Sequence, residues 1–450
     1  MRNRVETAIL ILMSGFLLLA SVVSAHHSAD AAPSKRSLSP IGSLPMAKPE
    51  EVGFSSDRLQ RIHDAIQRRI DGGDIPGAVT LVSRRGRVVH FEAQGFMDID
   101  AKRPMQKDSV FGLASMTKPI TATAILMLME QGKLRLNDPV SRFIPEFKNV
   151  TKVRVLAAGA TREAPGGNRD QPNPNQDPGS ELVPLSREIT VRDLLTHTSG
   201  LMSIAVTNPA APPRSAMQSS TLATLVPRFA LPLDFQPGTR WAYSNWAGFD
   251  VLGRVVEVAS GKPFDQFLKE NILDPLDMKD TGFKPLADSR APRFARPYRR
   301  TPNGLAKGEP PTQTDFITSP TYFSGAAGLS STAEDSWRFA QMLANGGEFN
   351  GKRLLSPNTV ELMRSNQVGD LFPGSGIFPA HGSGFGLSVA VVTDHIMAGI
   401  PEGTFGWDGA FGCQFLVSPK ENMVMVIMIQ ISDTVTRLDF QNAVMQAITQ

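Results

Sequence analysis

Residues 111–130 read FGLASMTKPITATAILMLME, and this stretch decides how the rest of the chain is interpreted. From Ile120 onward the run is almost entirely apolar, which predicts a helix buried inside the protein rather than one with a polar face. Pro119 is compatible with a helix that begins just before it, because the first N–H groups of a helix have no intrahelical acceptor. We therefore expect a short turn and then a long buried helix over 115–131.

Ser115 and Lys118 lie at the opening of this helix and, three residues apart, share one face of it. A serine at a helix N-terminus lies in positive backbone potential, which favours a developing alkoxide. A lysine whose pKa is lowered by burial can help to remove the serine proton. This spacing is the Ser-x-x-Lys arrangement of active-site-serine acyl enzymes, although an N-cap serine beside a solvated lysine gives the same letters by chance.

The composition is that of an ordinary globular protein of 450 residues, long enough for one large domain or two intergrown domains. The 46 basic and 43 acidic residues leave a net charge of only +3, which does not favour nucleic acid or an anionic membrane as a partner. Cys413 is the single cysteine, so no intrachain disulfide forms. No pair among the seven histidines has zinc-site spacing on a helix, and we expect neither a metal nor a cofactor.

The first 25 residues have the layout of a cleaved signal peptide. A basic segment over 1–4 precedes an apolar segment over 8–19, and Val23-Ser-Ala25 offers a cleavage site. The apolar segment is short for a membrane anchor, the alternative interpretation. Residues 26–50 resemble a flexible leader, so the sequence predicts an exported protein, periplasmic or secreted.

Both ends of the remaining chain are rich in predicted strands. An amphipathic helix over 56–70 precedes a hairpin over 77–94, with its turn at Arg85-Gly86. Strand-like segments recur at 403–411, 413–418 and 423–430, before a final helix over 434–448. We expect one sheet built from both ends of the chain, with a helical region inserted between them.

The middle of the chain combines short helices with long polar loops. Residues 157–188 and 284–322 are rich in Pro, Gly and polar residues and are interpreted as loops. Helices are predicted at 189–201, 247–259, 263–272 and 331–344.

A serine nucleophile of this kind usually needs a second titratable group, and tyrosine is scarce in the chain. Of Tyr243, Tyr298 and Tyr322, only Tyr243 has an Asn two residues on. A phenol near a buried lysine cation is held closer to phenolate, so that it can accept the serine proton. A core tyrosine is the alternative. His197 is expected to be structural, and the thiol of Cys413 buried and inert.

Five segments follow in the order of a known family: Phe111-Gly-Leu-Ala-Ser-Met-Thr-Lys118, Leu194-Leu-Thr-His-Thr-Ser-Gly-Leu201, Tyr243-Ser-Asn245, Gly325-Ala-Ala-Gly-Leu-Ser-Ser-Thr332 and Trp407-Asp-Gly409. In these the chain resembles the β-lactamase-like serine hydrolases, which include class C β-lactamases, D-Ala-D-Ala peptidases and family VIII carboxylesterases. The likeness spans roughly residues 50 to 448.

The resemblance implies an α+β fold in which an antiparallel sheet flanked by helices is formed from both chain ends, with an inserted helical domain. The hydrolase domain would cover 51–448. Its α/β part would comprise about 51–118 and 325–448, and the helical insertion about 119–324. The site would lie between the two parts, and catalysis would proceed through an acyl-enzyme.

The resemblance also assigns roles to individual residues. Ser115 would be the nucleophile, and Lys118 and Tyr243 the proton-transfer pair, with the choice of base between them left open. Asn245 would be a polar contact to the substrate and to Lys118. The backbone N–H groups of Ser115 and Ala410 would form the oxyanion hole.

The third motif, Trp407-Asp-Gly409, departs from the Lys-Thr-Gly of β-lactamases. In a strand, Trp407 and Gly409 point to one face and Asp408 to the other. We expect Trp407 and Gly409 to border the substrate, with Trp407 as an apolar wall and Gly409 leaving room for a close approach. Lys279-Asp-Thr-Gly282 has one residue too many and is interpreted as unrelated to this motif.

Trp407 favours the esterase branch, so the expected function is hydrolysis of small or short-chain esters. The alternatives are a β-lactamase or D-Ala-D-Ala carboxypeptidase, and a binding or scaffold protein that keeps only the fold. The expected partner is a small ester or amide substrate, with no nucleic acid and no stable membrane span after signal cleavage.

Overall fold

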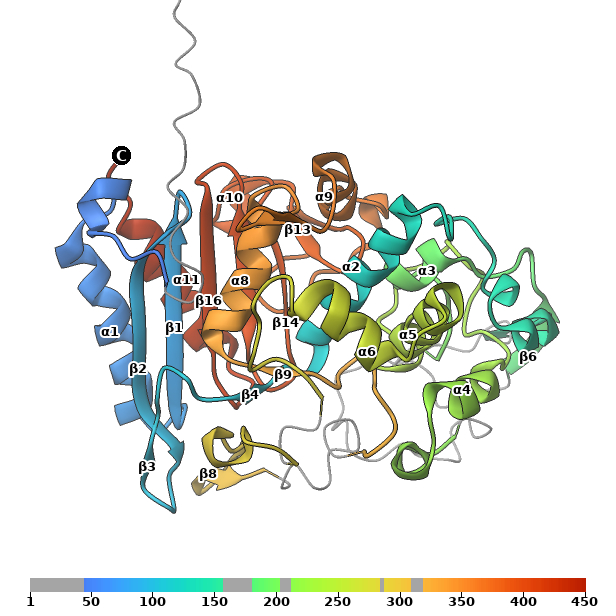
Figure 1. The fold of residues 1–450 in the computed structure, drawn as a ribbon, viewed down its shortest axis with the longest axis horizontal. Helices are drawn as coiled ribbons and strands as arrows, with labels where there is room; N and C mark the ends of the chain where they lie inside the picture. Colours follow the sequence, from blue (N-terminus) through green and yellow to red (C-terminus); the bar gives the residue numbers. More distant parts are fainter. Residues whose placement is uncertain (1–43, 157–179, 203–211, 284–286, 309–318) are drawn as a thin grey trace, which may run out of the picture. The chain divides into compact units, whose positions relative to one another are not determined.

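An eight-stranded sheet runs through the protein in the order β12-β13-β14-β15-β16-β1-β2-β3 (Figure 1). Every pair of neighbouring strands is antiparallel. The strands are β1 (Gly77–Arg84), β2 (Arg87–Asp98), β3 (Arg103–Pro104), β12 (Ser383–Phe385), β13 (Ala390–Val392), β14 (Phe405–Asp408), β15 (Gln414–Ser418) and β16 (Met423–Met428). The fold class is thus the predicted one, an antiparallel sheet assembled from both ends of the chain.

The computed structural model describes residues 44–156, 180–202, 212–283, 287–308 and 319–450. The chain divides into two compact units, Met1–Pro40 and Ile41–Gln450. The first unit, which contains the predicted signal peptide and most of the leader, lies outside the described residues. Everything below concerns the second unit.

The centre of the sheet joins segments that are far apart in the sequence. β1 is buried along its whole length and pairs with β2 on one side and with β16 on the other, with Val79 opposite Met428. The β1–β2 turn falls at Arg85 and Gly86, as predicted, and both residues have a positive φ. A strand buried on both faces reads as a continuous apolar run, which is the pattern of β16 (MVMVIM).

Helices cover both faces of this sheet (Figure 1). α1 (Ser56–Asp71) and α11 (Thr434–Gln446) pack against each other on one face, and α8 (Ala333–Ala344) packs against β1, β15 and β16 on the other. The stripe of α1 faces inward as predicted, with Leu59, Ile62 and Ile66 buried. α8 begins at Thr332, whose side chain accepts the N–H of Asp335.

The two ends of the second unit lie side by side. The Ser55 N–H donates to the Ala447 carbonyl at 2.9 Å, and the Thr449 N–H donates to the Gly53 carbonyl at 2.9 Å. The guanidinium of Arg84 also reaches the Gln450 carbonyl, at 2.6 Å. These bonds fasten the C-terminal residues to the start of α1.

The helical region is organised around α2 (Thr117–Glu130), the buried helix predicted from the opening stretch. All ten residues over 117–126 are buried, and α2 packs against α5 (Ala247–Ser260). A helix without a polar face requires such a position. The remaining helices of the described chain are α3 (Val191–Leu195), α4 (Leu222–Leu225), α6 (Phe264–Leu268), α9 (Pro357–Arg364) and α10 (His395–Ala398).

Two of the predicted loops contain strands. Ser180–Pro184 forms β6, which pairs with β5 (Lys152–Leu156), and β7 (Tyr298–Thr301) pairs with β8 (Gly304–Lys307). The loop interpretation of 157–188 and 284–322 was therefore wrong at these four- and five-residue strands. They are short and lie among residues rich in Pro, Gly and polar side chains, so their surroundings in the sequence resemble loops. Residues 157–179, 284–286 and 309–318 lie outside the described part.

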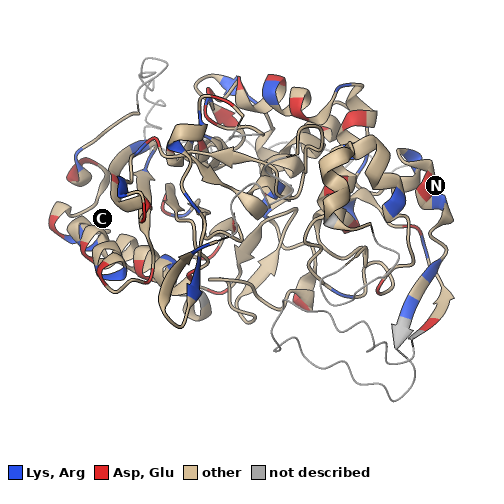
Figure 2. Cartoon of the chain, turned by 90° about the horizontal axis from the view of Figure 1, so that it is seen from below, with Lys and Arg blue, Asp and Glu red and all other residues tan. Residues whose placement is uncertain are grey.

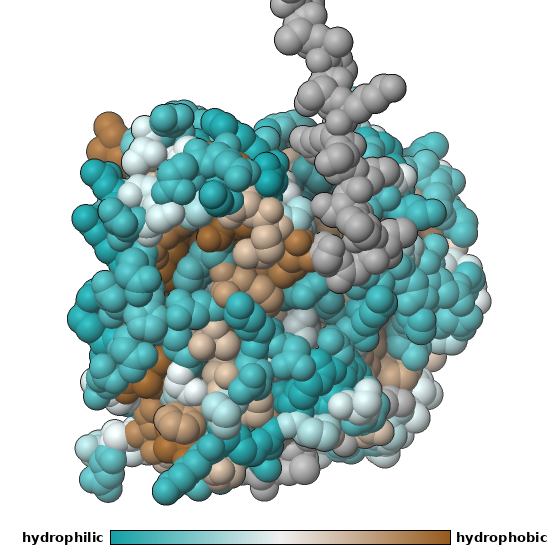
Figure 3. Space-filling model, turned by 60° about the vertical axis from the view of Figure 1, so that its left-hand side comes forward, coloured by the Kyte–Doolittle hydropathy of each residue, from teal (hydrophilic) through white to brown (hydrophobic). Residues whose placement is uncertain are grey.

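The exterior mixes both signs of charge, consistent with the small net charge. Lys and Arg alternate with Asp and Glu over the elements seen in Figure 2. On the face shown in Figure 3, hydrophobic residues form patches interrupted by hydrophilic ones. Within the described residues, no helix combines the length and apolar character needed to cross a bilayer.

We predict that His90 makes the protein sensitive to acid. Its Nε2 lies 2.7 Å from Thr80 Oγ1, and burial lowers the pKa of His90 to about 4. Between about pH 6.5 and pH 4 the unfolded chain binds a proton that the folded chain refuses, so the free energy of unfolding falls as the pH falls. Between pH 7.5 and pH 4.5 this one group should remove about 2 to 3 kcal/mol.

The measurement is urea unfolding of the wild type and of His90→Gln at both pH values. The variant should lose less stability on acidification than the wild type by that amount, since all other titrating groups are shared. Equal losses in the two proteins would contradict the prediction.

Candidate active site

Ser115 lies in a single 3₁₀ turn, Ala114–Met116, that runs directly into α2. The residue before it, Ala114, has φ +45°, a left-handed conformation that costs energy for a residue with a side chain. Ser115 remains partly exposed, whereas its neighbours on both sides are buried. The turn therefore presents one hydroxyl at the N-terminal end of a buried helix, as predicted.

Short strands beside the serine turn fix its position. β4 (Phe111–Gly112) pairs with β9 (Ser330–Ser331), and the Leu113 N–H donates to the Leu329 carbonyl at 2.9 Å. The end of β14 approaches from the sheet, so that a Cβ on Gly409 would lie 2.2 Å from the Leu113 carbonyl oxygen. This contact explains the glycine of the third motif: it lets the end of β14, an interior strand of the sheet, reach the backbone of the serine turn. That reason differs from the room for substrate that we expected.

Lys118 is fully buried in the first turn of α2, and its ammonium nitrogen has three partners. Nζ lies 3.1 Å from Ser115 Oγ, 2.8 Å from the Asn245 carbonyl oxygen and 3.1 Å from the Ala326 carbonyl oxygen. The rings of Tyr243 and Phe249 lie beside it, with their centroids 4.9 and 5.6 Å from Nζ. The structure thus brings together Ser115, Lys118 and Tyr243, the three residues predicted to carry the chemistry.

Burial lowers the pKa of Lys118 to about 7, so the neutral amine is well populated near neutral pH. A neutral amine has two N–H donors and one lone pair. The two carbonyl oxygens can only accept, so they take the two N–H groups, and the lone pair is left for Ser115 Oγ. In this state the Ser115 hydroxyl donates to Nζ, the arrangement that a general base requires.

A buried carboxylate lies behind Lys118. Asp250 on α5 is fully buried and accepts hydrogen bonds from Tyr322 (2.8 Å), Ser324 (2.7 Å) and the Ala326 N–H (3.2 Å). Burial raises the pKa of Asp250 to about 6, against the effect of these donors. Asp250 therefore fixes the segment that supplies the Ala326 carbonyl to Lys118.

Tyr243 is held from behind by His197. Their ring centroids are 4.4 Å apart, and His197 Nδ1 accepts the N–H of Ser244 at 3.2 Å. The His197 carbonyl accepts the N–H of Ala242 at 3.0 Å. Burial lowers the pKa of His197 well below its usual value, so the ring is neutral. His197 is thus the structural residue predicted, and its contacts set the position of the Tyr243 ring.

The expectation that Lys118 holds Tyr243 close to phenolate was wrong. Burial raises the pKa of Tyr243 well above its ordinary value, and the nearby polar groups of Ser115 and Trp407 offset only part of this rise. The main cause is the burial of the phenol, which outweighs any help from Lys118, an amine that is itself only partly charged at neutral pH. Tyr243 is therefore a protonated phenol at neutral pH.

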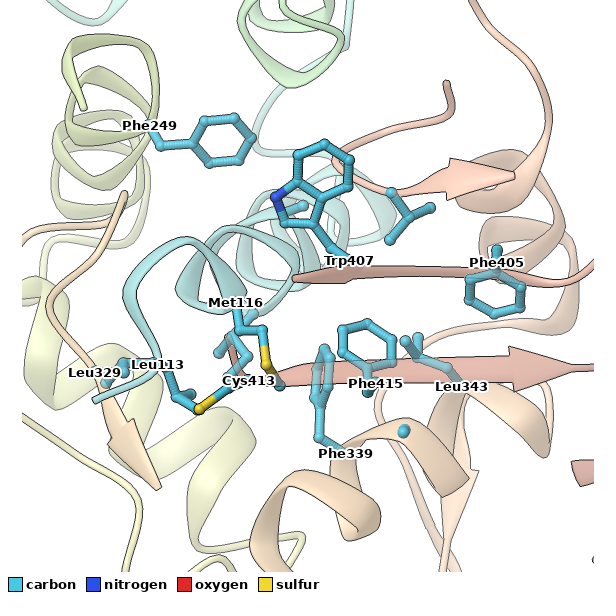
Figure 4. Close-up of a cluster of buried hydrophobic side chains, with 14 of the residues drawn as sticks. Leu113, Met116, Phe249, Leu329, Phe339, Leu343, Phe405, Trp407, Cys413 and Phe415 are labelled. Atoms are coloured by element: carbon cyan, nitrogen blue, oxygen red, sulfur yellow. The ribbon is translucent and has the colours of Figure 1, made fainter. Parts of the chain in front are cut away.

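The third motif points in two directions, as the strand pattern predicted. Trp407 projects from β14 toward Tyr243 and Phe385, with ring centroids 5.8 and 5.2 Å away. Figure 4 shows its ring on the side of Phe249. Asp408 points to the other face, where it forms an ion pair with the buried Arg437 of α11.

Two further predicted residues lie at this end of the site. Asn245 contributes its main-chain carbonyl to Lys118, and the residue is exposed. Ala410 follows Gly409 and is exposed, next to the serine turn that Gly409 touches. The contacts of these residues with substrate, and the oxyanion hole formed by Ser115 and Ala410, remain proposals.

Sequence reasoning did not assign Asp250 or Ala326, and it predicted contact between Asn245 and Lys118 without indicating that the main-chain carbonyl makes it. Asp250 could have been found, because it is an acidic residue in the apolar run AGFDVLGRVVEVA of α5. The carbonyl acceptors belong to the backbone, and no side-chain pattern marks them. Lys279 of the Lys279–Gly282 segment is an exposed residue paired with Asp277, in keeping with its interpretation as unrelated.

Comparison with known proteins identifies a family whose model covers most of the chain. The Beta-lactamase family model matches residues 62–449. Protein Rv1367c of Mycobacterium tuberculosis is 36% identical over 386 residues, covering 81% of this chain and 88% of that protein. Esterase EstB of Burkholderia gladioli is 32% identical over 383 residues, covering 78% and 85%.

Among solved structures, one of EstCE1, "a hydrolase with promiscuous acyltransferase activity", superposes with a TM-score of 0.70 at 28% identity. It covers 86% of this chain and 98% of that one. The chain therefore belongs to the β-lactamase family of serine hydrolases. Its relatives within that family include esterases.

We predict that acylation of Ser115 follows the titration of Lys118. With the neutral amine as the base, the rate should rise with pH through an apparent pKa of about 7 and level off above it. The measurement is the rate at which a fluorophosphonate probe labels the protein between pH 5 and pH 9. A rate that stays flat across about two pH units around neutrality would exclude Lys118 as the titrating base.

Proposed function

We propose that the protein is a carboxylesterase that hydrolyses small or short-chain esters through an acyl-enzyme on Ser115. The observation that carries the proposal is the buried Lys118 amine, whose Nζ lies within hydrogen-bond distance of two carbonyl oxygens and of Ser115 Oγ. Burial, which lowers its pKa to about 7, suits this amine to act as the base. The esterases among its relatives support the same class of substrate. The predicted signal peptide supports a periplasmic or secreted location.

In the proposed reaction Lys118 takes the Ser115 proton as Oγ attacks the ester carbonyl. The backbone N–H groups of Ser115 and Ala410 receive the charge that develops on the carbonyl oxygen. The protonated Tyr243 gives its proton to the departing alkoxide and recovers one from Lys118. In deacylation water takes the place of the alcohol and the proton transfers run in the opposite direction: water gives a proton to Tyr243, and Ser115 recovers one from Lys118 as the acid is released.

The choice of ester over β-lactam rests on the third motif. A β-lactam carries a carboxylate that needs a charged partner, and a missing hydrogen bond to a charged group costs on the order of 1.5–3 kcal/mol. Trp407 supplies no cation at this position, and Asp408 is engaged with Arg437. The site therefore favours neutral acyl and alcohol groups, while a β-lactamase or D-Ala-D-Ala carboxypeptidase is the alternative.

We predict that the wild-type protein hydrolyses p-nitrophenyl acetate and butyrate, and turns over a chromogenic cephalosporin and benzylpenicillin weakly or not at all. Ser115→Ala should lower ester turnover by about 10³-fold or more while the far-ultraviolet circular dichroism is kept. A higher kcat/KM on either antibiotic than on every ester would assign the protein to the alternative. Undiminished turnover by Ser115→Ala would remove Ser115 from the mechanism.

We also predict that Tyr243→Phe keeps the fold and loses most activity on alkyl esters, by about 10²-fold or more. The substitution deletes only the phenolic oxygen, while the ring contacts with His197 and Trp407 are retained. The measurement is kcat/KM for ethyl acetate alongside the melting temperature. An unchanged kcat/KM would leave Lys118 as the only proton-transfer group.

A further inference from the structure

Trp407 is almost completely covered by protein, which conflicts with a role as a wall for substrate. The residue is 3% exposed, and the rings of Tyr243 and Phe385 lie against the indole. A surface this small offers a bound acyl or alcohol group little contact area. The reason for a tryptophan here must lie in what the indole touches inside the protein.

The indole N–H of Trp407 is a buried donor with no hydrogen-bond partner among the described residues. The hydroxyl of Tyr243 is likewise buried and has no hydrogen-bond partner among the described residues. A buried polar group without a partner is destabilising, so two such groups at one place require a reason. Catalytic hydrogen bonds are often long or misaligned without substrate and tighten during the reaction.

These two unpartnered groups belong to neighbouring rings. The centroids are 5.8 Å apart with the planes tilted by 40°. No formed hydrogen bond joins them, but Ser115 and Trp407 are the side chains whose polar groups lower the pKa of the Tyr243 hydroxyl. In Figure 4 the nitrogen edge of the Trp407 ring is turned to the side of Phe249, away from Phe405. The phenolic oxygen thus has Ser115 as one neighbour and the Trp407 N–H as another.

A phenol can donate one hydrogen bond and accept two. If its O–H points at the reacting oxygen, its lone pairs remain for Trp407. Once the proton has left, the phenolate is a buried anion, and a hydrogen bond to an ionised group is roughly twice as strong as a neutral one. The indole N–H would therefore stabilise the phenolate more than the phenol, which is the condition for lowering a barrier.

Resting on the proposed function, we propose that Trp407 is a positioning residue whose indole N–H donates to the Tyr243 oxygen while that oxygen passes its proton to the leaving alkoxide. In this step the bond between the acyl carbon and the alkoxide oxygen breaks. The phenol proton moves to that oxygen, and Tyr243 becomes a phenolate held by Trp407. Lys118, which carries the former Ser115 proton, then returns a proton to the phenolate.

The test compares two esters of the same acid. Ethoxide is a strong base and must be protonated to leave, whereas p-nitrophenolate leaves without a proton. Trp407→Phe should lower kcat/KM for ethyl acetate about tenfold or more, but that for p-nitrophenyl acetate by less than about threefold. A role in packing alone would lower both values by the same factor, and that result would overturn the proposal.

Trp241→Phe is the matched control. Trp241 also stacks on Tyr243, at 6.1 Å, and its Nε1 is buried as well, but Trp407 is the tryptophan that acts on the hydroxyl. The Trp241 variant should show no difference between the two esters. A difference as large as that of Trp407→Phe would overturn the assignment of Trp407.

A double-mutant cycle completes the test. In a Tyr243→Phe background, Trp407→Phe should cause no further loss on ethyl acetate, because the oxygen that receives its N–H is absent. Losses that multiply would contradict the proposal. If Trp407→Phe fails to fold, β-(3-benzothienyl)alanine at position 407 keeps the shape of the ring and replaces the N–H by sulfur.

The outcome separates this inference from the proposed function. If Ser115→Ala retains ester turnover, the proposed function is wrong. If Ser115→Ala is inactive and Trp407→Phe loses both esters equally, the esterase assignment stands and only the role of Trp407 is overturned.

Discussion

The burial of the Lys118 amine is the constraint on which the site depends. Moving an ammonium ion away from water is costly, and the protein offsets the cost with backbone carbonyls rather than with an adjacent carboxylate. Asp250 is near enough to affect the pKa of Lys118, but its oxygens are taken up by Tyr322, Ser324 and the Ala326 N–H. A direct salt bridge would have kept the lysine charged, whereas neutral carbonyls allow it to lose a proton near neutral pH.

The same constraint explains why distant segments meet at one point. The Asn245 carbonyl comes from the segment before α5 and the Ala326 carbonyl from the segment before β9, and both must reach Nζ. The Thr121 hydroxyl donates to the Gly325 carbonyl at 2.7 Å, and a Cβ on Gly325 would lie 2.5 Å from the Phe249 carbonyl oxygen. α2, α5 and the 324–329 segment are thus packed at backbone contact, which keeps water from the amine.

Sequence reasoning found the side chains of the site but not their electrostatics. Ser115, Lys118 and Tyr243 were predictable because spacing and order along the chain identify them, and the antiparallel sheet was predictable from apolar runs at both ends. The rise in the pKa of Tyr243 could not be predicted, because it depends on burial by His197 and Trp407, which are far from Tyr243 in the sequence. Likewise, Gly409 suggested space for a ligand, while the structure shows contact with the Leu113 carbonyl.

The pairing of β1 with β16 has a consequence for when the protein can fold. Val79 of β1 pairs with Met428 of β16, so the middle of the sheet cannot form until nearly the whole chain has been synthesised. Contacts between residues so far apart in sequence also slow folding, because a long loop must close before they are gained. In the nascent chain β1 therefore has an unpaired edge, although in the folded protein it is paired on both sides. That edge needs protection from aggregation until β16 has been synthesised.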